Sequence, residues 1–154
     1  MTRYTIAAIS VSVPAPDAPW RECPSDPDGE AGVLGSVLAD PACLPRVAGI
    51  VRGGEAFADP RHREAYRALT RLGPGDRSPE ALRAELHAIA GARYAEDLAA
   101  CVPSAANAVW YGLRMRAAYR RREIIRAAAL ATREAYDGSV AAARAAMTGG
   151  VEDT

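Results

Sequence analysis

The sequence contains no lysine. All 19 of its cationic side chains are arginine, and they balance 19 aspartates and glutamates, so the formal net charge is zero. A Walker-type phosphate-binding loop and a Schiff base both require a lysine amine. This stretch of 154 residues therefore excludes ATP binding by such a loop, Schiff-base catalysis and a lysine general base.

Cysteines and aromatic residues are also scarce. Cys23, Cys43 and Cys101 are too few and too widely spaced for a disulfide framework or a paired-cysteine metal site, which indicates small apolar side chains in a reducing cytoplasm. One Phe, two Trp and six Tyr stand against abundant alanine, the residue of highest helix propensity. The composition and length favour an all-α core in a single domain.

Long apolar runs are missing as well. The segment Ile6–Val13 covers about eight residues, well short of the roughly 20 that a membrane span needs and weak as a secretory leader. We therefore expect a cytoplasmic protein without a membrane segment.

Residues 1–28 are predicted to form an extended, proline-rich N-terminal arm. Within it, Tyr4–Val13 carries β-branched residues in rough alternation, which is compatible with a short strand or an extended segment. Five prolines follow between positions 14 and 28, and they prevent helix formation.

Residues 29–103 are predicted to form a small orthogonal helical head. Helical periodicity begins at Gly29 with an apolar face of Val33, Leu34, Val37 and Leu38 that ends at Asp40-Pro41. Further helices are expected near 42–51, 61–72 and 80–89, because an Asp or Ser cap followed by Pro marks a helix start. The capping pairs are Asp40-Pro41, Asp59-Pro60 and Ser78-Pro79.

Residues 104–150 are predicted to form a long helix and a helical hairpin. Helical spacing runs from about Ala106 to Tyr136, roughly 45 Å if unbroken, so part of this helix should project from the head. After Asp137-Gly138 a short apolar stripe of Val140, Ala143 and Met147 indicates a truncated return helix.

Several strings between about residues 28 and 138 resemble, in order and approximate spacing, the amino-terminal domain of bacterial DnaB-type replicative DNA helicases. Gly32 departs from the family by replacing a larger side chain inside a helix, at a cost of up to about 1 kcal/mol. The segment between Leu82 and Tyr94 is also several residues shorter. The matching strings are EAGVLGSVLADP (30–41), FADPRHR (57–63), Tyr94 with Leu98, VPSAAN (102–107), Tyr111, Arg116 and RRE (121–123).

This resemblance implies a helical head and a hairpin that pairs with the hairpin of a neighbouring subunit. It also implies docking of primase, replicative helicase or helicase loader in the primosome of a bacterium or phage. The chain ends where the family continues through a linker into a RecA-like ATPase, so ATP hydrolysis and strand separation are not implied. We therefore expect no enzyme activity.

No catalytic residue, cofactor-binding residue or metal site is predicted. His62 and His87 lack partners at the spacing that metal binding needs, so a structural role outweighs a catalytic or ligand role for both. Asp59 is expected to cap a helix instead of acting as a base. No cofactor is expected.

The predicted interface lies on the long helix. Trp110 is a candidate because large aromatic residues are enriched at interfaces, and an apolar stripe along the helix is assigned to pairing between protomers. The full set is Trp110, Leu113, Arg116, Arg120, Ile124, Ala128 and Ala131.

The same helix is locally basic, with seven arginines against Glu123 alone between positions 114 and 133. Phosphates or an acidic partner surface are candidate ligands for Arg114, Arg121, Arg122 and Arg126. A solvated face whose arginine stems cover alanine explains the same pattern. Two hypotheses stay open, a self-associating docking module and a small protein that binds nucleic acid weakly, with strong salt dependence, through residues 114–133.

Overall fold

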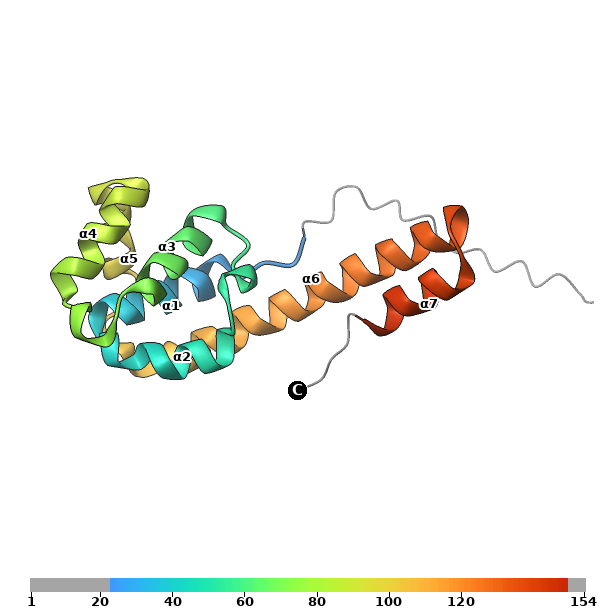
Figure 1. Cartoon of the computed structure of the whole chain (residues 1–154). Helices are drawn as coiled ribbons and strands as arrows, with labels where there is room; N and C mark the ends of the chain where they lie inside the picture. The colour runs from blue at the N-terminus through green and yellow to red at the C-terminus, as the bar shows by residue number, and fades with distance from the viewer. Residues whose placement is uncertain (1–22, 150–154) are drawn as a thin grey trace, which may run out of the picture.

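The computed structural model of the chain describes residues 23–149, and this range contains α-helices and short 3-10 turns but no β-strand (Figure 1). The predicted all-α architecture of a helical head followed by a hairpin is confirmed. The segment 4–13, predicted to be a strand or an extended segment, lies outside the described residues. The helices are α1 (Pro27–Ala39), α2 (Leu44–Val51), α3 (Pro60–Arg71), α4 (Pro79–Ala90), α5 (Ala92–Ala100), α6 (Ala108–Asp137) and α7 (Val140–Thr148).

The predicted caps Asp59 and Ser78 begin α3 and α4, and the predicted cap Asp40 begins the 3-10 turn Pro41–Cys43 that leads into α2. Each capping side chain accepts a hydrogen bond from a backbone amide in the first turn, and proline occupies the first helical position. The bonds run from Ala42 N to Asp40 at 2.9 Å, from Arg61 N to Asp59 at 2.7 Å and from Ala81 N to Ser78 at 3.1 Å.

The first helix begins earlier than predicted. Asp26 accepts a hydrogen bond from Gly29 N at 3.1 Å, and Pro27 is the first residue of α1. The predicted boundary between arm and head after residue 28 therefore falls inside the first helical turn. Asp26-Pro27 is the same start signal that marks the later helices, and the surrounding prolines obscured it.

Helix α1 is the centre of the head. It contacts α3, α4, α5 and α6, and its predicted apolar residues Val33, Leu34 and Val37 are fully buried. Its other side is buried too, because a Cβ at Gly32 would lie 2.5 Å from the ring of Tyr111 and one at Gly35 would lie 2.4 Å from the carbonyl oxygen of Leu98. These two glycines thus allow α6 and α5 to pack directly against the α1 backbone.

Helix α6 joins the head to the hairpin. Its first half packs against α1 and α2, and its second half extends away from the head and carries the return helix α7 alongside it (Figure 1). The predicted projection of this helix and the truncated return helix are both present. Among residues 23–149 no single helix is both long and apolar enough to cross a membrane, although α1 and Pro41–Val51, bent by 119°, together reach that threshold by length and composition.

The residues just before α1 are fastened to α6. Arg114 forms an ion pair with Asp26 at 2.7 Å, and Arg122 donates to the carbonyl oxygen of Pro24 at 2.9 Å. Cys23, beside these contacts, is exposed, as is Cys101 after α5, whereas Cys43 is buried. Burial raises the pKa of the Cys43 thiol.

Candidate functional site

The large apolar side chains that stay exposed in residues 23–149 all belong to α6 and α7. Their exposed fractions run from 41% for Leu130 to 85% for Tyr136, whereas the large apolar residues of the head are buried or partly buried. Large apolar side chains left exposed on one part of a fold point to an interaction site. We call it the hairpin apolar surface, and it comprises Trp110, Leu113, Ile124, Ile125, Leu130, Tyr136, Val140 and Met147.

The structure brings most of the predicted apolar interface residues onto one side of α6. Trp110, Leu113 and Ile124 are 53%, 56% and 58% exposed, and Ala128 is exposed one turn beyond Ile124. Ala131 differs from the prediction, because it is only 8% exposed, in the part of α6 that packs against α7. Its small side chain serves packing within the hairpin and does not offer a surface to a partner.

The return helix packs through alanines. Ala142, Ala143 and Ala146 are partly buried, whereas Val140 and Met147 are 72% and 65% exposed. The apolar stripe of Val140, Ala143 and Met147 correctly indicated the return helix, but only Ala143 of the three is partly buried. Small residues face α6 because the two helices lie close together, and the larger side chains add to the hairpin apolar surface instead.

Three of the four arginines predicted to contact phosphate or an acidic partner already have partners within the chain. Arg114 pairs with Asp26 and lies over the ring of Trp110 at 4.7 Å, and Arg126 pairs with Glu123. Arg122 is only 4% exposed and donates to the carbonyl oxygens of Pro24 and Ala56. Its predicted external contact is thus replaced by a structural role.

Arg121 is the exception. It is exposed, and within the described part of the chain it makes no hydrogen bond or ion pair. Most of the arginines predicted to bind an external ligand therefore contact the residues just before α1 or another residue of α6.

Arg116 and Arg120 line a groove of about 290 Å³ between α2 and α6. Arg52 follows α2 in a left-handed conformation (φ 63°) and lines the same groove. Burial, together with the positive charges of Arg52 and Arg120, lowers the pKa of Arg116. We call this the basic groove, and the described residues that line it are Gly49, Ile50, Arg52, Leu113, Arg116, Ala117 and Arg120. The sequence carries no signal that brings Arg52 to this groove, because Arg52 lies far from α6 in the chain.

The head holds a buried polar cluster. Glu30 is 1% exposed, and its carboxylate accepts hydrogen bonds from the backbone amides of Ala58 at 2.7 Å and Asp59 at 3.2 Å. His62 Nδ1 lies 3.1 Å from the same carboxylate, and the His62 ring stacks on Tyr94. Burial and the nearby carboxylates of Asp59 and Glu30 raise the pKa of Tyr94. Because the carboxylate of Glu30 is occupied by donors from the chain, the cluster ties α1 to α3, in line with a structural His62.

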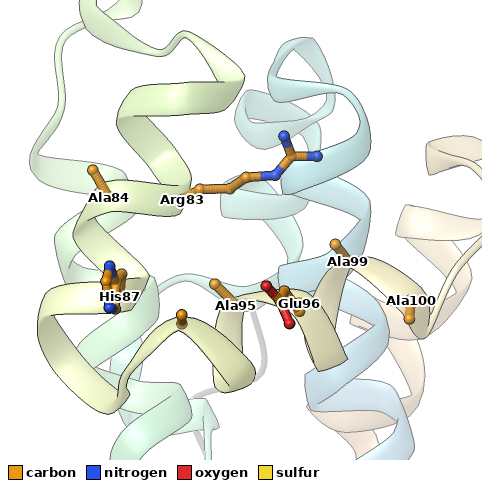
Figure 2. A pocket seen from close by; sticks show the side chains of 8 residues that line it. Arg83, Ala84, His87, Ala95, Glu96, Ala99 and Ala100 are labelled. Atoms are coloured by element: carbon orange, nitrogen blue, oxygen red, sulfur yellow. The ribbon is translucent and has the colours of Figure 1, made fainter.

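A second hollow of about 570 Å³ lies between α4 and α5 on the head (Figure 2). Its walls are mainly alanine, and Arg83, His87 and Glu96 are its charged or polar side chains. Within residues 23–149 these three side chains make no hydrogen bond with one another, and no group of three potential metal ligands occurs. The hollow therefore offers no assembled catalytic group.

Taken together, the fold and the exposed surfaces define a class of protein, an all-helical domain in which a compact head carries a projecting apolar hairpin. The chain belongs to the DnaB-like helicase N-terminal domain family, whose model matches residues 22–113.

A crystal structure of the N-terminal domain of DnaB helicase from Mycobacterium tuberculosis is similar to this chain, with a TM-score of 0.73 and 27% identity. The similarity covers 82% of this chain and 98% of that one.

Two replicative DNA helicases DnaB are also similar in sequence. The one from Rhodothermus marinus is 34% identical over 116 residues, which is 70% of this chain and 12% of the relative. The one from Treponema pallidum (strain Nichols) is 29% identical over 125 residues, which is 76% of this chain and 28% of the relative. The chain thus spans a small part of the length of these relatives.

Proposed function

We propose that this chain is a non-catalytic protein–protein interaction module of DNA replication, located in the cytoplasm. It self-associates through the α6–α7 hairpin and docks primase, the replicative helicase or a helicase loader. The observation that carries the proposal is the concentration of exposed large apolar side chains on the hairpin. The relatedness to helicase N-terminal domains supplies the replication context.

The physical argument for self-association is the cost of leaving this surface in water. Exposed apolar area costs roughly 25 cal/mol per Å² relative to buried area, so covering side chains such as Ile124 and Tyr136 favours association. A second hairpin is a suitable cover because it offers the same elongated apolar surface, as in two-fold symmetric dimers.

The test is sedimentation equilibrium of the whole chain over a range of concentrations. We expect a dimer or larger assembly for the unchanged protein and a shift to monomer for Ile124→Asp. The matched control is Ala88→Asp, which places the same charge on an exposed position of α4 in the head. A concentration-independent monomer for the unchanged protein would reject self-association.

Docking is tested separately by calorimetry. Purified primase, replicative helicase and helicase loader of the organism that encodes the chain are each titrated into the wild-type protein. Binding of at least one is expected, and binding of none would reject docking.

Nucleic-acid binding through residues 114–133 is the competing hypothesis. The internal partners of Arg114, Arg122 and Arg126 leave few guanidinium groups to neutralise phosphates. We therefore expect weak binding of a labelled single-stranded oligonucleotide that falls steeply as salt is raised. Nanomolar, sequence-specific binding at physiological salt would instead favour the nucleic-acid hypothesis.

A further inference from the structure

The residues just before α1 run toward the hairpin. Asp26 forms an ion pair with Arg114 at 2.7 Å. Two residues earlier, the carbonyl oxygen of Pro24 accepts a hydrogen bond from Arg122 at 2.9 Å. Arg122 lies eight residues beyond Arg114 in α6, about 12 Å further along the helix axis. Figure 1 shows the residues before α1, in blue, leaving it on the side of the hairpin. The chain that precedes Pro24 is therefore tethered to the middle of α6.

An exposed side of α6 continues from the Arg122 contact toward the end of the hairpin. Four uncharged residues follow Arg122 at steps of three, four, three and four, so they lie on the same side of the helix as Arg122. All four are exposed, and the largest of them, Tyr136, is 85% exposed. We call them the Ile125 stripe, and they are Ile125, Ala129, Thr132 and Tyr136.

The return helix leaves this stripe uncovered. The side of α6 that packs against α7 carries Ala127 and Ala131, which are partly buried and buried. Within the stripe, the Thr132 hydroxyl donates to the carbonyl oxygen of Ala128 at 2.8 Å, so its polar group is satisfied inside the helix. The Tyr136 hydroxyl, at the tip of its ring, can keep its contact with water while the ring is covered. An apolar cover would therefore bury no charge and no unpaired polar group of the stripe.

The segment 4–13, which lies outside the described residues, matches the stripe in chemistry. None of its ten residues is charged. Ile9, Val11 and Val13 alternate with two serines, so an extended conformation would place three β-branched side chains on one face and the serines on the other. Such a face covers apolar surface without burying a charge.

The tether between this segment and α6 is long enough. Ten residues, 14–23, separate the segment from Pro24, and at roughly 3.1 Å per residue an extended proline-rich chain spans up to about 31 Å. The stripe ends at Tyr136, about 21 Å along α6 from Arg122. A tether of this length also gives an effective concentration on the order of millimolar, far above that of a second copy in dilute solution.

We propose that residues 4–13 pack on the Ile125 stripe of their own chain. The consequence for function rests on the self-association proposed above and is competition. Ile125 and Tyr136 belong to the hairpin apolar surface that a second copy would cover, so the segment and a second copy cannot hold them at the same time. Ile124 lies roughly 100° around the helix from Ile125 and is not covered by the segment.

Nuclear magnetic resonance of the full chain tests the packing directly. With isotope-labelled Ile, Val and Tyr side chains, nuclear Overhauser effects are expected between the methyl groups of residues 9–13 and the Ile125 methyl groups or the Tyr136 ring. A mixture of labelled and unlabelled chains distinguishes contacts within one chain from contacts between two copies. Contacts between copies only, contacts with another region such as the hollow between α4 and α5, or no contacts would each overturn the proposal.

Two adjacent isoleucines provide the matched variants for this measurement. Ile125→Asp places a charge inside the stripe and should abolish the contacts between residues 9–13 and Tyr136. Ile124→Asp places the same charge on another side of α6 and should preserve them. Circular dichroism verifies that both variants remain folded. Contacts that survive in Ile125→Asp, or that are lost equally in both variants, would contradict packing on this stripe.

Sedimentation equilibrium of the full chain tests the competition. A segment that covers the stripe about nine-tenths of the time raises the apparent dissociation constant of self-association about ten-fold. The double variant Ile9→Asp/Val11→Asp should release the stripe and self-associate at least about five-fold more tightly than wild type.

The control is the double variant Ser10→Asp/Ser12→Asp, which adds the same charge to the alternate positions of the segment. Its dissociation constant should differ from that of wild type by less than about two-fold. Equal dissociation constants for the two double variants, or weaker association of Ile9→Asp/Val11→Asp, would overturn the competition.

The two proposals fail in different ways. A chain that shows the contacts within one chain but sediments as a monomer, in wild type and in Ile9→Asp/Val11→Asp, rejects self-association and supports the packing of residues 4–13. A chain that self-associates without contacts between residues 4–13 and the stripe rejects the packing alone.

Discussion

His62 Nδ1 lies 3.1 Å from Glu30 Oε2, although 32 positions separate the two residues in the chain. The same carboxylate accepts the amides of Ala58 and Asp59, so one buried side chain fixes the start of α3 against α1. This arrangement makes Glu30 a structural residue whose loss the head should not tolerate.

Glu30→Ala is expected to lower the free energy of unfolding by about 3–5 kcal/mol, because it leaves buried donors without an acceptor. Glu30→Gln should cost less, since the amide oxygen keeps one acceptor. Urea denaturation measures both. Glu64→Ala, at an exposed position of α3, is the control and should change the value by less than about 0.5 kcal/mol. A Glu30→Ala protein as stable as the control would contradict this role.

Gly35→Ala should destabilise the head by about 1–3 kcal/mol or more. The added Cβ would lie 2.4 Å from the backbone carbonyl oxygen of Leu98, so α5 would have to move away from α1. Gly49→Ala is the opposite case, since nothing lies within 4 Å of its Cβ position and it sits inside α2. That substitution should leave stability unchanged or raise it by up to about 1 kcal/mol. Thermal unfolding of the Gly35→Ala and Gly49→Ala variants tests whether α5 packs closely on α1 at Gly35. Equal melting temperatures for the two variants would refute this packing.

Arg122→Met should lower the free energy of unfolding by about 2–4 kcal/mol. The variant keeps a long side chain but leaves the carbonyl oxygens of Pro24 and Ala56 without their donor. Arg121→Met, at the adjacent exposed position, should have an effect below about 0.5 kcal/mol. Chemical denaturation compares the two. Similar effects in both variants would show that Arg122 does not fasten the residues before α1.

The lowered pKa of Asp59 predicts that the protein loses stability in acid. Its hydrogen bond with the Arg61 side chain is the main reason that its pKa falls from 3.8 to about 2. Because the folded-state pKa is the lower one, the stabilisation is complete above pH 3.8 and is lost as the pH falls through about 2. Arg61 is well exposed, so solvent screening reduces the effect to about 1 kcal/mol.

The measurement is the urea midpoint of wild type and Asp59→Asn between neutral pH and pH 2. The variant keeps a side chain that caps the helix but has no charge to titrate. The two curves should differ at neutral pH and converge in acid. A difference that persists unchanged at pH 2 would rule out this linkage.

Several helix starts of the head could be predicted from the sequence because their signals are local. Asp59 and Ser78 cap α3 and α4, and Asp40 caps the 3-10 turn before α2, each through an amide two or three residues away. Helix α5 has no side-chain cap, so no such signal marks its start. Asp26-Pro27 is the same kind of start signal, but the prolines around it predicted an extended segment, so the start of α1 was placed too late.

The roles of the individual arginines could not be predicted in the same way. Arg121 and Arg122 are adjacent and chemically identical, yet one is exposed and the other is 4% exposed. Their difference arises from the carbonyl groups of Pro24 and Ala56, which lie 98 and 66 residues away. The apolar residues Leu113 and Ile124 could be assigned to the exposed stripe because helical periodicity is local, whereas the burial of Ala131 depends on how α7 folds back.

The three cysteines offer a practical consequence. Cys43 is shielded in the core, while Cys23, next to the fastened segment on α6, and Cys101, at the end of α5, are open to reagents. The unmodified sequence thus presents two addressable thiols, one next to the Pro24 carbonyl that Arg122 of α6 holds and one at the end of α5, with no engineered cysteine required. Paired dyes or spin labels at these positions would form a molecular ruler that reports any change in the distance between the residues before α1 and the end of α5 when a partner binds.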